Sequence, residues 1–133
     1  MTLRAPSLDE RRLVIVWGAA ALIALALRPV LPAIAALSPV CPIHALLGIP
    51  CASCGTTRAA LRLARLDVIG AVQVNPLATL GLVGFVSGGL AAPLWMALGG
   101  GVPQVPSVPS LRWRLGMAAA ILFNWIYLLG RGV

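Results

Sequence analysis

The sequence contains no lysine and almost no acidic residues. All ten positive charges are arginine, and the acids are only Asp9, Glu10 and Asp67. Two of these acids lie in a short polar head, so the chain has no carboxylate pair for general acid–base catalysis. It also has no phosphate-binding loop or nucleotide motif. These absences argue against hydrolytic or nucleotide-dependent chemistry by this chain alone.

Charged residues of either sign are scarce. They make up 10% of the 133 residues, whereas 60% are hydrophobic, which is more apolar material than a water-soluble core of this size can hide. The arginines flank apolar runs instead of forming a basic face with interleaved aromatics, so no nucleic-acid partner is expected. The net charge of +7 indicates membrane topology and partnership with membrane lipids, chiefly their anionic headgroups.

The apolar runs predict an all-α integral membrane protein with about three transmembrane helices in a single membrane domain. The expected segments, in order, are a polar head at 1–12, a first span at 13–37, a Cys/Arg segment at 38–67, a second span at 75–98, a Gly/Pro linker at 99–110 and a third span at 111–130.

The first span has two interpretations. Pro29 and Pro32 are expected to bend its helix or to end it near the membrane interface. A cleavable signal peptide is the alternative, because Arg11 and Arg12 precede the apolar core and a small-x-small triplet follows at 24–26. The same arginine pair favours a cytoplasmic N-terminus in a bacterial inner membrane, which places the Cys/Arg segment on the outer, disulfide-permissive side.

The second and third spans carry signals of their own. Asn75 is expected to cap the second helix, with Pro76 at its first position. Small residues recur in this span and either let another helix approach closely or reflect the usual glycine content of membrane helices: Gly81, Gly84, Ser87 and Gly88. In the third span, the polar Asn124 is expected to form a hydrogen bond with a neighbouring helix.

The Cys/Arg segment is too apolar for a solvated loop and too interrupted for a simple crossing. Helix breakers recur in its first half, at Pro39, Pro42, Gly48 and Pro50. A re-entrant or interfacial helix-loop-helix fits this pattern. In its second half, Arg58, Arg62 and Arg65 fall on one helical face. With Thr57 at the helix start, they are candidates for binding phosphate or carboxylate groups; the alternative is an interfacial helix with snorkelling arginines.

All three cysteines lie in this segment. Cys51 and Cys54 form a C-x-x-C pair directly before the helix expected to begin at Gly55 to Thr57. The positive end of that helix and Arg58 would stabilise a thiolate, so the pair is a candidate redox-active or nucleophilic site. Cys41 would then be a resolving or structural partner.

Two other interpretations of the cysteines remain open. Cys41, His44, Cys51 and Cys54 form C-x-x-H and C-x-x-C knuckles that could hold a zinc ion; no cofactor is certain. Alternatively, the thiols simply pack or form a structural disulfide.

Three pieces of the sequence together resemble a known family. Cys-Pro at Cys41, the stretch GIPCASCGTTRA from Gly48 to Ala59, and Asn-Pro-Leu from Asn75 are similar to the bacterial membrane proteins grouped as domain of unknown function 2752. The resemblance implies a small integral membrane protein with no settled activity. The positions that match its motif are Cys41, Cys51, Cys54, Gly55, Thr57, Arg58, Asn75 and Pro76.

Two residues depart from the family pattern. Ala52 replaces a usual proline between the paired cysteines, and His44 is not part of the motif, so a zinc site that needs His44 would be peculiar to this chain.

From the C-x-x-C pair and the helix start that follows it, the sequence predicts a thiol-redox site at the membrane surface, acting on a thiol partner protein. The alternatives are an anion- or lipid-binding module with structural cysteines, and a subunit whose spans pack on a helical partner.

Overall fold

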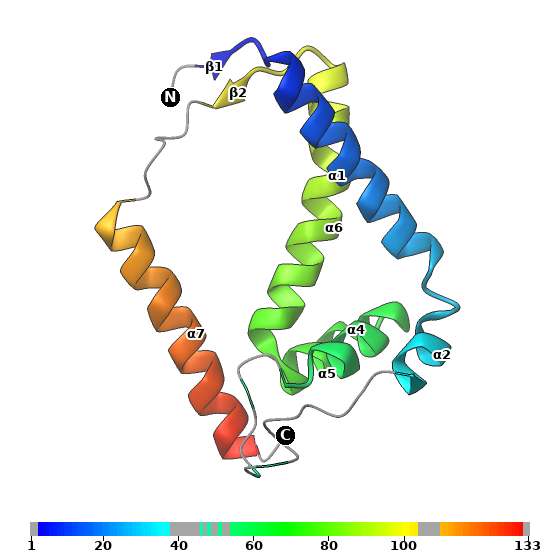
Figure 1. The fold of residues 1–133 in the computed structure, drawn as a ribbon, viewed down its shortest axis with the longest axis vertical. Helices are drawn as coiled ribbons and strands as arrows, with labels where there is room; N and C mark the ends of the chain where they lie inside the picture. The colour runs from blue at the N-terminus through cyan, green and yellow to red at the C-terminus, as the bar shows by residue number, and fades with distance from the viewer. Residues whose placement is uncertain are drawn as a thin grey trace. The chain divides into compact units, whose positions relative to one another are not determined.

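The computed structural model describes residues 3–37, 46, 48, 51, 54–103 and 110–131. Its elements are helices apart from one two-stranded ladder (Figure 1). In chain order they are β1 (Leu3–Arg4), α1 (Leu8–Ala26), α2 (Leu31–Ala36), α4 (Thr56–Ala64), α5 (Val68–Val74), α6 (Pro76–Ala97), β2 (Val102–Pro103) and α7 (Leu111–Arg131).

The chain divides into two units. The first unit comprises Met1–Arg28 with Val83–Pro109, and the second comprises Pro29–Leu82 with Ser110–Val133. Helix α6 therefore contributes its first turns to the second unit and the rest of its length to the first. The candidate site residues at 51–75 all belong to the second unit.

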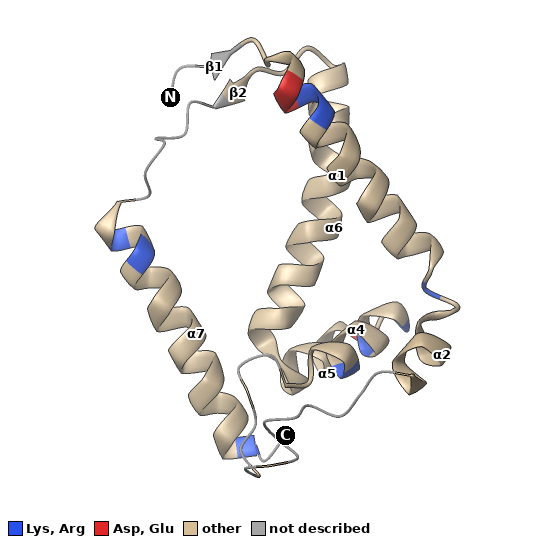
Figure 2. Cartoon of the chain, viewed as in Figure 1, with Lys and Arg blue, Asp and Glu red and all other residues tan. Residues whose placement is uncertain are grey.

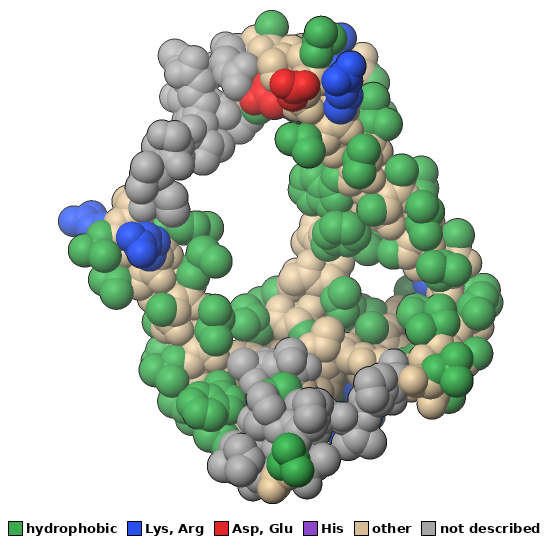
Figure 3. All heavy atoms as spheres, viewed as in Figure 1, with side chains coloured by type: hydrophobic (Ala, Val, Ile, Leu, Met, Phe, Trp, Pro, Cys, Tyr) green, Lys and Arg blue, Asp and Glu red, His purple; other side chains and the backbone are tan. Residues whose placement is uncertain are grey.

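Helices α6 and α7 are long and apolar enough to cross a membrane. Only 11% of the most apolar window of each helix is buried, so neither resembles the core helix of a soluble protein. Hydrophobic side chains cover much of the surface in Figure 3. Those that are exposed on these two helices include Leu80, Leu94 and Phe123. These two helices confirm the apolar helices expected at 75–98 and 111–130.

The expected first span consists of two helices. Helix α1 starts with a capping box, in which Ser7 accepts the Glu10 amide and Glu10 accepts the Ser7 amide. It ends at Ala26, and a turn at 27–30 leads to α2, as the prolines in this region predict. Two helices in the described part of the chain meet both the length and the apolarity required for a membrane span, and α1 is not one of them because charged residues occupy its first turn (Figure 2).

The strand pair was not expected from the sequence. Leu3 pairs with Pro103 and Arg4 with Val102 in an antiparallel ladder within the first unit. Two-residue strands are too short to show the alternating pattern by which strands are recognised, so the segment that contains β2 was predicted only as a linker.

Within the first unit, α1 packs closely on the second half of α6. The indole Nε1 of Trp17 donates a hydrogen bond to the carbonyl oxygen of Phe85 at 3.0 Å, and the two rings lie 6.2 Å apart. A Cβ atom added to Gly89 would lie 2.7 Å from the Cβ of Ala21, and one added to Gly88 would lie 2.7 Å from the Trp17 ring. Glycine at these two positions therefore lets the helices approach.

We expect Gly89→Ala to destabilise this contact. The added methyl group must push α1 away, at a cost of about 1–3 kcal/mol in the free energy of unfolding, measured by denaturant titration in detergent micelles. Gly81→Ala is the matched control, because it makes the same change in the same helix where nothing lies within 4 Å. Equal stability of the two variants would contradict the close packing.

Candidate functional site

Cys51 and Cys54 form a tight turn that brings their sulfur atoms together. The amide of Cys54 donates to the carbonyl oxygen of Cys51 at 2.9 Å, and the two Sγ atoms lie 3.2 Å apart as free thiols. The amide of Cys51 also donates to the Sγ of Cys54 at 3.1 Å. The two hydrogen bonds close the turn and hold the sulfur atoms close together. Cys54 is buried, whereas Cys51 is partly exposed.

The residue after the pair has a backbone conformation that suits glycine. Gly55 has a φ of +82° and stands at the N-cap of α4, which begins at Thr56 as the sequence predicted. A side chain at this position would be strained, so the glycine allows the chain to turn from the cysteines directly into a helix. The positive end of α4 therefore follows the thiols immediately.

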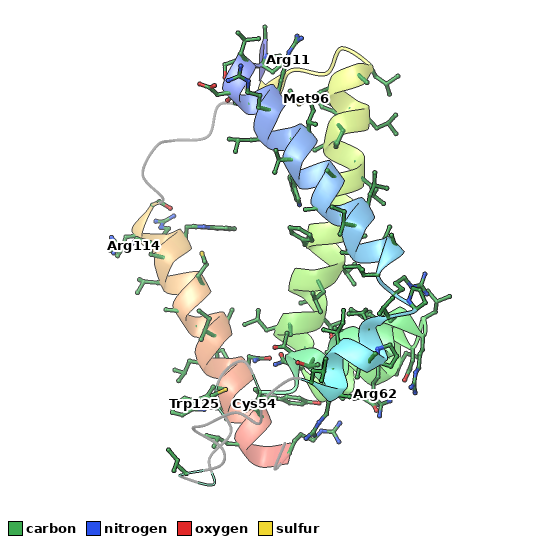
Figure 4. The ribbon with its side chains drawn as sticks, turned by 45° about the vertical axis from the view of Figure 1, so that its right-hand side comes forward. Arg11, Cys54, Arg62, Met96, Arg114 and Trp125 are labelled. Carbon is green, nitrogen blue, oxygen red and sulfur yellow. The ribbon has the colours of Figure 1, made fainter. Side chains whose placement is uncertain are left out.

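Asn75 fastens the cysteine turn to the start of α6. Its side-chain Nδ2 donates to the carbonyl oxygen of Cys54 at 3.0 Å, and its Oδ1 accepts the amide of Ala78 at 2.9 Å. The residue is only 1% exposed. The second bond confirms the predicted cap, and the first places Cys54 beside the start of α6 (Figure 4).

Asn124 of α7 completes the cap of α6. Its Oδ1 accepts the amide of Leu77 at 3.1 Å, which confirms the expected hydrogen bond to a neighbouring helix. Thr79 donates its hydroxyl to the carbonyl oxygen of Asn75 at 2.8 Å. Pro76 has no amide hydrogen, so every amide donor in the first turn of α6 is satisfied by an asparagine. This end of α6 offers no amide to an anion.

The two bonds of Asn75 can be separated by mutation. We expect Asn75→Ser to keep a good helix cap but to lose the donor to Cys54. The turn should then hold Cys54 less firmly, which we expect to change the rate and pH dependence of alkylation of the thiols by a maleimide.

Asn75→Ala and Asn124→Ser distinguish the two effects. Asn75→Ala loses both bonds and should also lower the stability of α6, by about 1 kcal/mol for the cap. Asn124→Ser removes the acceptor of the Leu77 amide and keeps both side-chain bonds of Asn75, so its alkylation profile should change less than that of Asn75→Ser. An unchanged profile in Asn75→Ser would show that Asn75 only caps the helix.

The three predicted arginines lie within α4 or at its C-terminal end. Arg58 and Arg62 are within the helix, Arg65 is its C-cap, and all three are exposed. Figure 2 colours the arginine positions along α4 blue. Arg62 donates from Nη1 to Oδ2 of Asp67 at 2.8 Å. Thr57 is exposed in the first turn. The structure thus places these candidate residues on one short helix that follows the cysteine pair.

Asp67 links α4 to α5. Its Oδ1 accepts the amide of Gly70 at 2.9 Å and thereby caps α5, a helix that the sequence analysis did not predict. The Gly70 amide, and then Arg62, hold the pKa of the Asp67 carboxyl below its ordinary value of 3.8. A Cβ atom on Gly70 would collide with both Asp67 and Arg62, so a glycine is needed where the two helices meet.

The lowered pKa of Asp67 predicts an acid-sensitive α4–α5 hairpin. The unfolded chain takes up the proton more readily than the folded one, so the stabilisation is complete above about pH 4 and is lost as the pH falls through the lower folded pKa. The unfolding midpoint should therefore fall less on acidification in Asp67→Asn than in the unmodified protein, because the variant has no carboxyl group to protonate at this position. Asp9→Asn, at an exposed aspartate in α1, is the control, and equal acid profiles for both variants would contradict the prediction.

The zinc interpretation is not tested by these contacts. Cys41 and His44 lie outside the described residues. Among the residues that are described, no group of three or more histidine, cysteine or acidic side chains could hold a metal ion. Asp67, the acid nearest in sequence to the cysteines, already has both oxygens engaged. The Cys41, His44, Cys51 and Cys54 knuckle therefore stays a prediction.

Comparison with known families agrees with the motif. Residues 41–88 match the family model described as protein of unknown function (DUF2752). The match confirms the resemblance and covers the cysteine turn, α4, α5 and the first half of α6. It therefore includes Asn75 and its Cys54 partner, but not α1 or α7. No curated protein and no solved structure matches the chain.

Proposed function

We propose that this chain is a multi-pass protein of the bacterial inner membrane whose Cys51 and Cys54 exchange electrons with the disulfide of a partner protein. The observation that carries the proposal is the 3.2 Å separation of the two sulfur atoms in one turn. A disulfide bond is about 2.05 Å long, so only a small closure of this turn is needed when the partner disulfide oxidises the pair.

The membrane part of the proposal rests on α6 and α7, with α1 and α2 as a third crossing. The apolar part of α1, from 13 to 26, rises about 21 Å, which is shorter than the hydrocarbon core of a bilayer. The apolar sequence continues to residue 37, and we propose that this stretch supplies the remaining length of the crossing. Exposed apolar side chains along this region support lipid contact: Leu13, Ile15, Val16, Leu22, Ile23, Ile34 and Leu37.

The proposed exchange conserves atoms and electrons. The Cys51 thiol loses its proton to water, and the resulting thiolate attacks one sulfur of the partner disulfide. A mixed disulfide forms, and the first partner thiolate leaves and takes up a proton. The Cys54 thiol then loses its proton to water, and its thiolate attacks the sulfur of Cys51. The second partner thiolate leaves and takes up a proton. Two electrons pass to the partner, and the pair becomes a Cys51–Cys54 disulfide.

The two cysteines have different roles in this exchange reaction. Cys51 is the attacking residue because it is the more exposed of the two. Cys54 is the resolving residue, since it is buried and accepts the amide of Cys51. Arg58, one turn into α4, is proposed to favour the thiolate forms, and Cys41 is proposed as a second resolving or structural thiol.

Serine variants test the assignment with an aromatic disulfide reagent whose released thiol is coloured. In a Cys41→Ser background, the purified protein should release two coloured thiols per chain and end with an internal disulfide. Adding Cys54→Ser should stop the reaction at one released thiol, with the reagent attached to Cys51. Adding Cys51→Ser should remove the fast phase, because only the buried thiol remains.

Two outcomes would overturn the proposal. Exchange that proceeds unchanged in both serine variants would show that the pair does not react. Thiols of the full chain that become reactive after a strong chelator, and not after a reductant, would move the assignment to a metal knuckle of Cys41, His44, Cys51 and Cys54.

A further inference from the structure

We infer that the turn between α4 and α5 is a docking surface for the phosphate headgroups of an anionic bilayer. This α4–α5 surface consists of Arg58, Arg62, Arg65, Leu66, Val68 and Ile69, all of which are exposed. The inference does not depend on thiol exchange, since neither cysteine contributes to the surface. Three observations carry it: a strained apolar residue, an exposed apolar cluster, and two arginines with no acidic partner among the described residues.

Leu66 holds a conformation that glycine would hold more easily. Its φ is +63°, in the left-handed region. The Leu66 amide donates to the carbonyl oxygen of Leu63, and the Asp67 amide donates to that of Arg62, both at 2.9 Å. This pattern is a Schellman motif, in which glycine usually occupies the position of Leu66.

The leucine gains no compensating burial within the protein. Its exposed fraction is 75%, so the side chain packs on little of the fold that strains it. Val68 and Ile69 follow in the first turn of α5 and are 51% and 74% exposed. Three large apolar side chains therefore lie together at the tip of the hairpin without cover. Insertion into the acyl boundary of a bilayer would bury them.

The arginines supply the complementary charge. Arg62 is held in place by Asp67, whereas Arg58 and Arg65 have no acidic partner within the part of the chain that the structure describes. The surface thus carries three guanidinium groups and one carboxylate. Guanidinium groups bind phosphate oxygens in a bidentate manner, and their combination with adjacent apolar side chains suits the boundary between headgroups and acyl chains. A soluble anion would use the arginines but not Leu66 or Ile69.

The test compares lipid retention by the full chain in mixed micelles of phosphatidylglycerol and phosphatidylcholine, read by native mass spectrometry. The double variant Arg58→Gln/Arg65→Gln should lose phosphatidylglycerol, roughly fivefold for each arginine, and should keep phosphatidylcholine. Arg112→Gln/Arg114→Gln is the matched control, since it removes the same charge at the exposed start of α7. Equal losses of phosphatidylglycerol from the two double variants would contradict lipid binding at the α4–α5 surface.

Leu66→Gly separates recognition from folding. Because glycine relieves the strain at φ +63°, the unfolding midpoint should stay the same or rise, while retention of phosphatidylglycerol should fall. Unchanged retention would show that the apolar tip does not contact lipid.

Displacement of the lipid by inorganic phosphate at equal concentration would identify a site for free phosphate instead of a bilayer. Thiol exchange should be unaffected in Leu66→Gly and in Arg112→Gln/Arg114→Gln, which change no residue assigned to the exchange, so a failure of Leu66→Gly to lower lipid retention leaves the proposed exchange standing.

Discussion

The hydrogen bonds of one buried carboxamide organise the site. Asn75 uses its donor for the carbonyl oxygen of Cys54 and its acceptor for the amide of Ala78. Because both groups belong to one rigid planar amide, the cysteine turn and the first turn of α6 hold a fixed relation to one another. Asn124 extends the arrangement to α7 through the amide of Leu77. The candidate dithiol is therefore attached to the start of α6 by Asn75, and that start is attached to the middle of α7 by Asn124.

The two helix starts near this cluster differ in what they offer. In the first turn of α6, the amides of Leu77 and Ala78 already donate hydrogen bonds to the side-chain oxygens of Asn124 and Asn75. The positive end of this helix is therefore neutralised locally. In α4, the N-cap is Gly55, which has no side chain to perform that role. The end that faces the cysteine pair is thus the less capped of the two, and its dipole is the one that can act on sulfur.

Local signals predicted the elements, but contacts distant in sequence escaped prediction. The cap at Asn75, the helix start after Cys54 and the two apolar helices all follow from residues within one or two turns. The bond between Asn75 and Cys54 joins residues 21 apart, and no periodicity encodes it. A polar residue in an apolar run, such as Asn124, predicts a hydrogen-bond partner. The sequence does not predict that this partner is the amide of Leu77.

The α4–α5 hairpin shows a different limit. Glycine is the residue that sequence reasoning associates with a left-handed helix end, so Leu66 gave no sign that α4 stops there. Asp67 precedes an apolar run and so could have been recognised as the cap of a further helix. However, the seven residues of α5 contain a glycine and three valines, which have low helix propensity. Arg58 and Arg62 lie within the helix that was expected after the cysteine pair, and Arg65 is its C-cap, whereas the binding role of the three arginines stays a prediction.

The residue that follows Asn75 also protects it chemically. Deamidation of asparagine usually begins when the backbone nitrogen of the next residue attacks the side-chain carbonyl and closes a five-membered ring. Here the next residue is Pro76, whose nitrogen carries no hydrogen and cannot complete that ring closure. The same proline that suits the first position of α6 therefore keeps the carboxamide from ageing into a carboxylate, which would accept hydrogen bonds but could no longer donate one to Cys54.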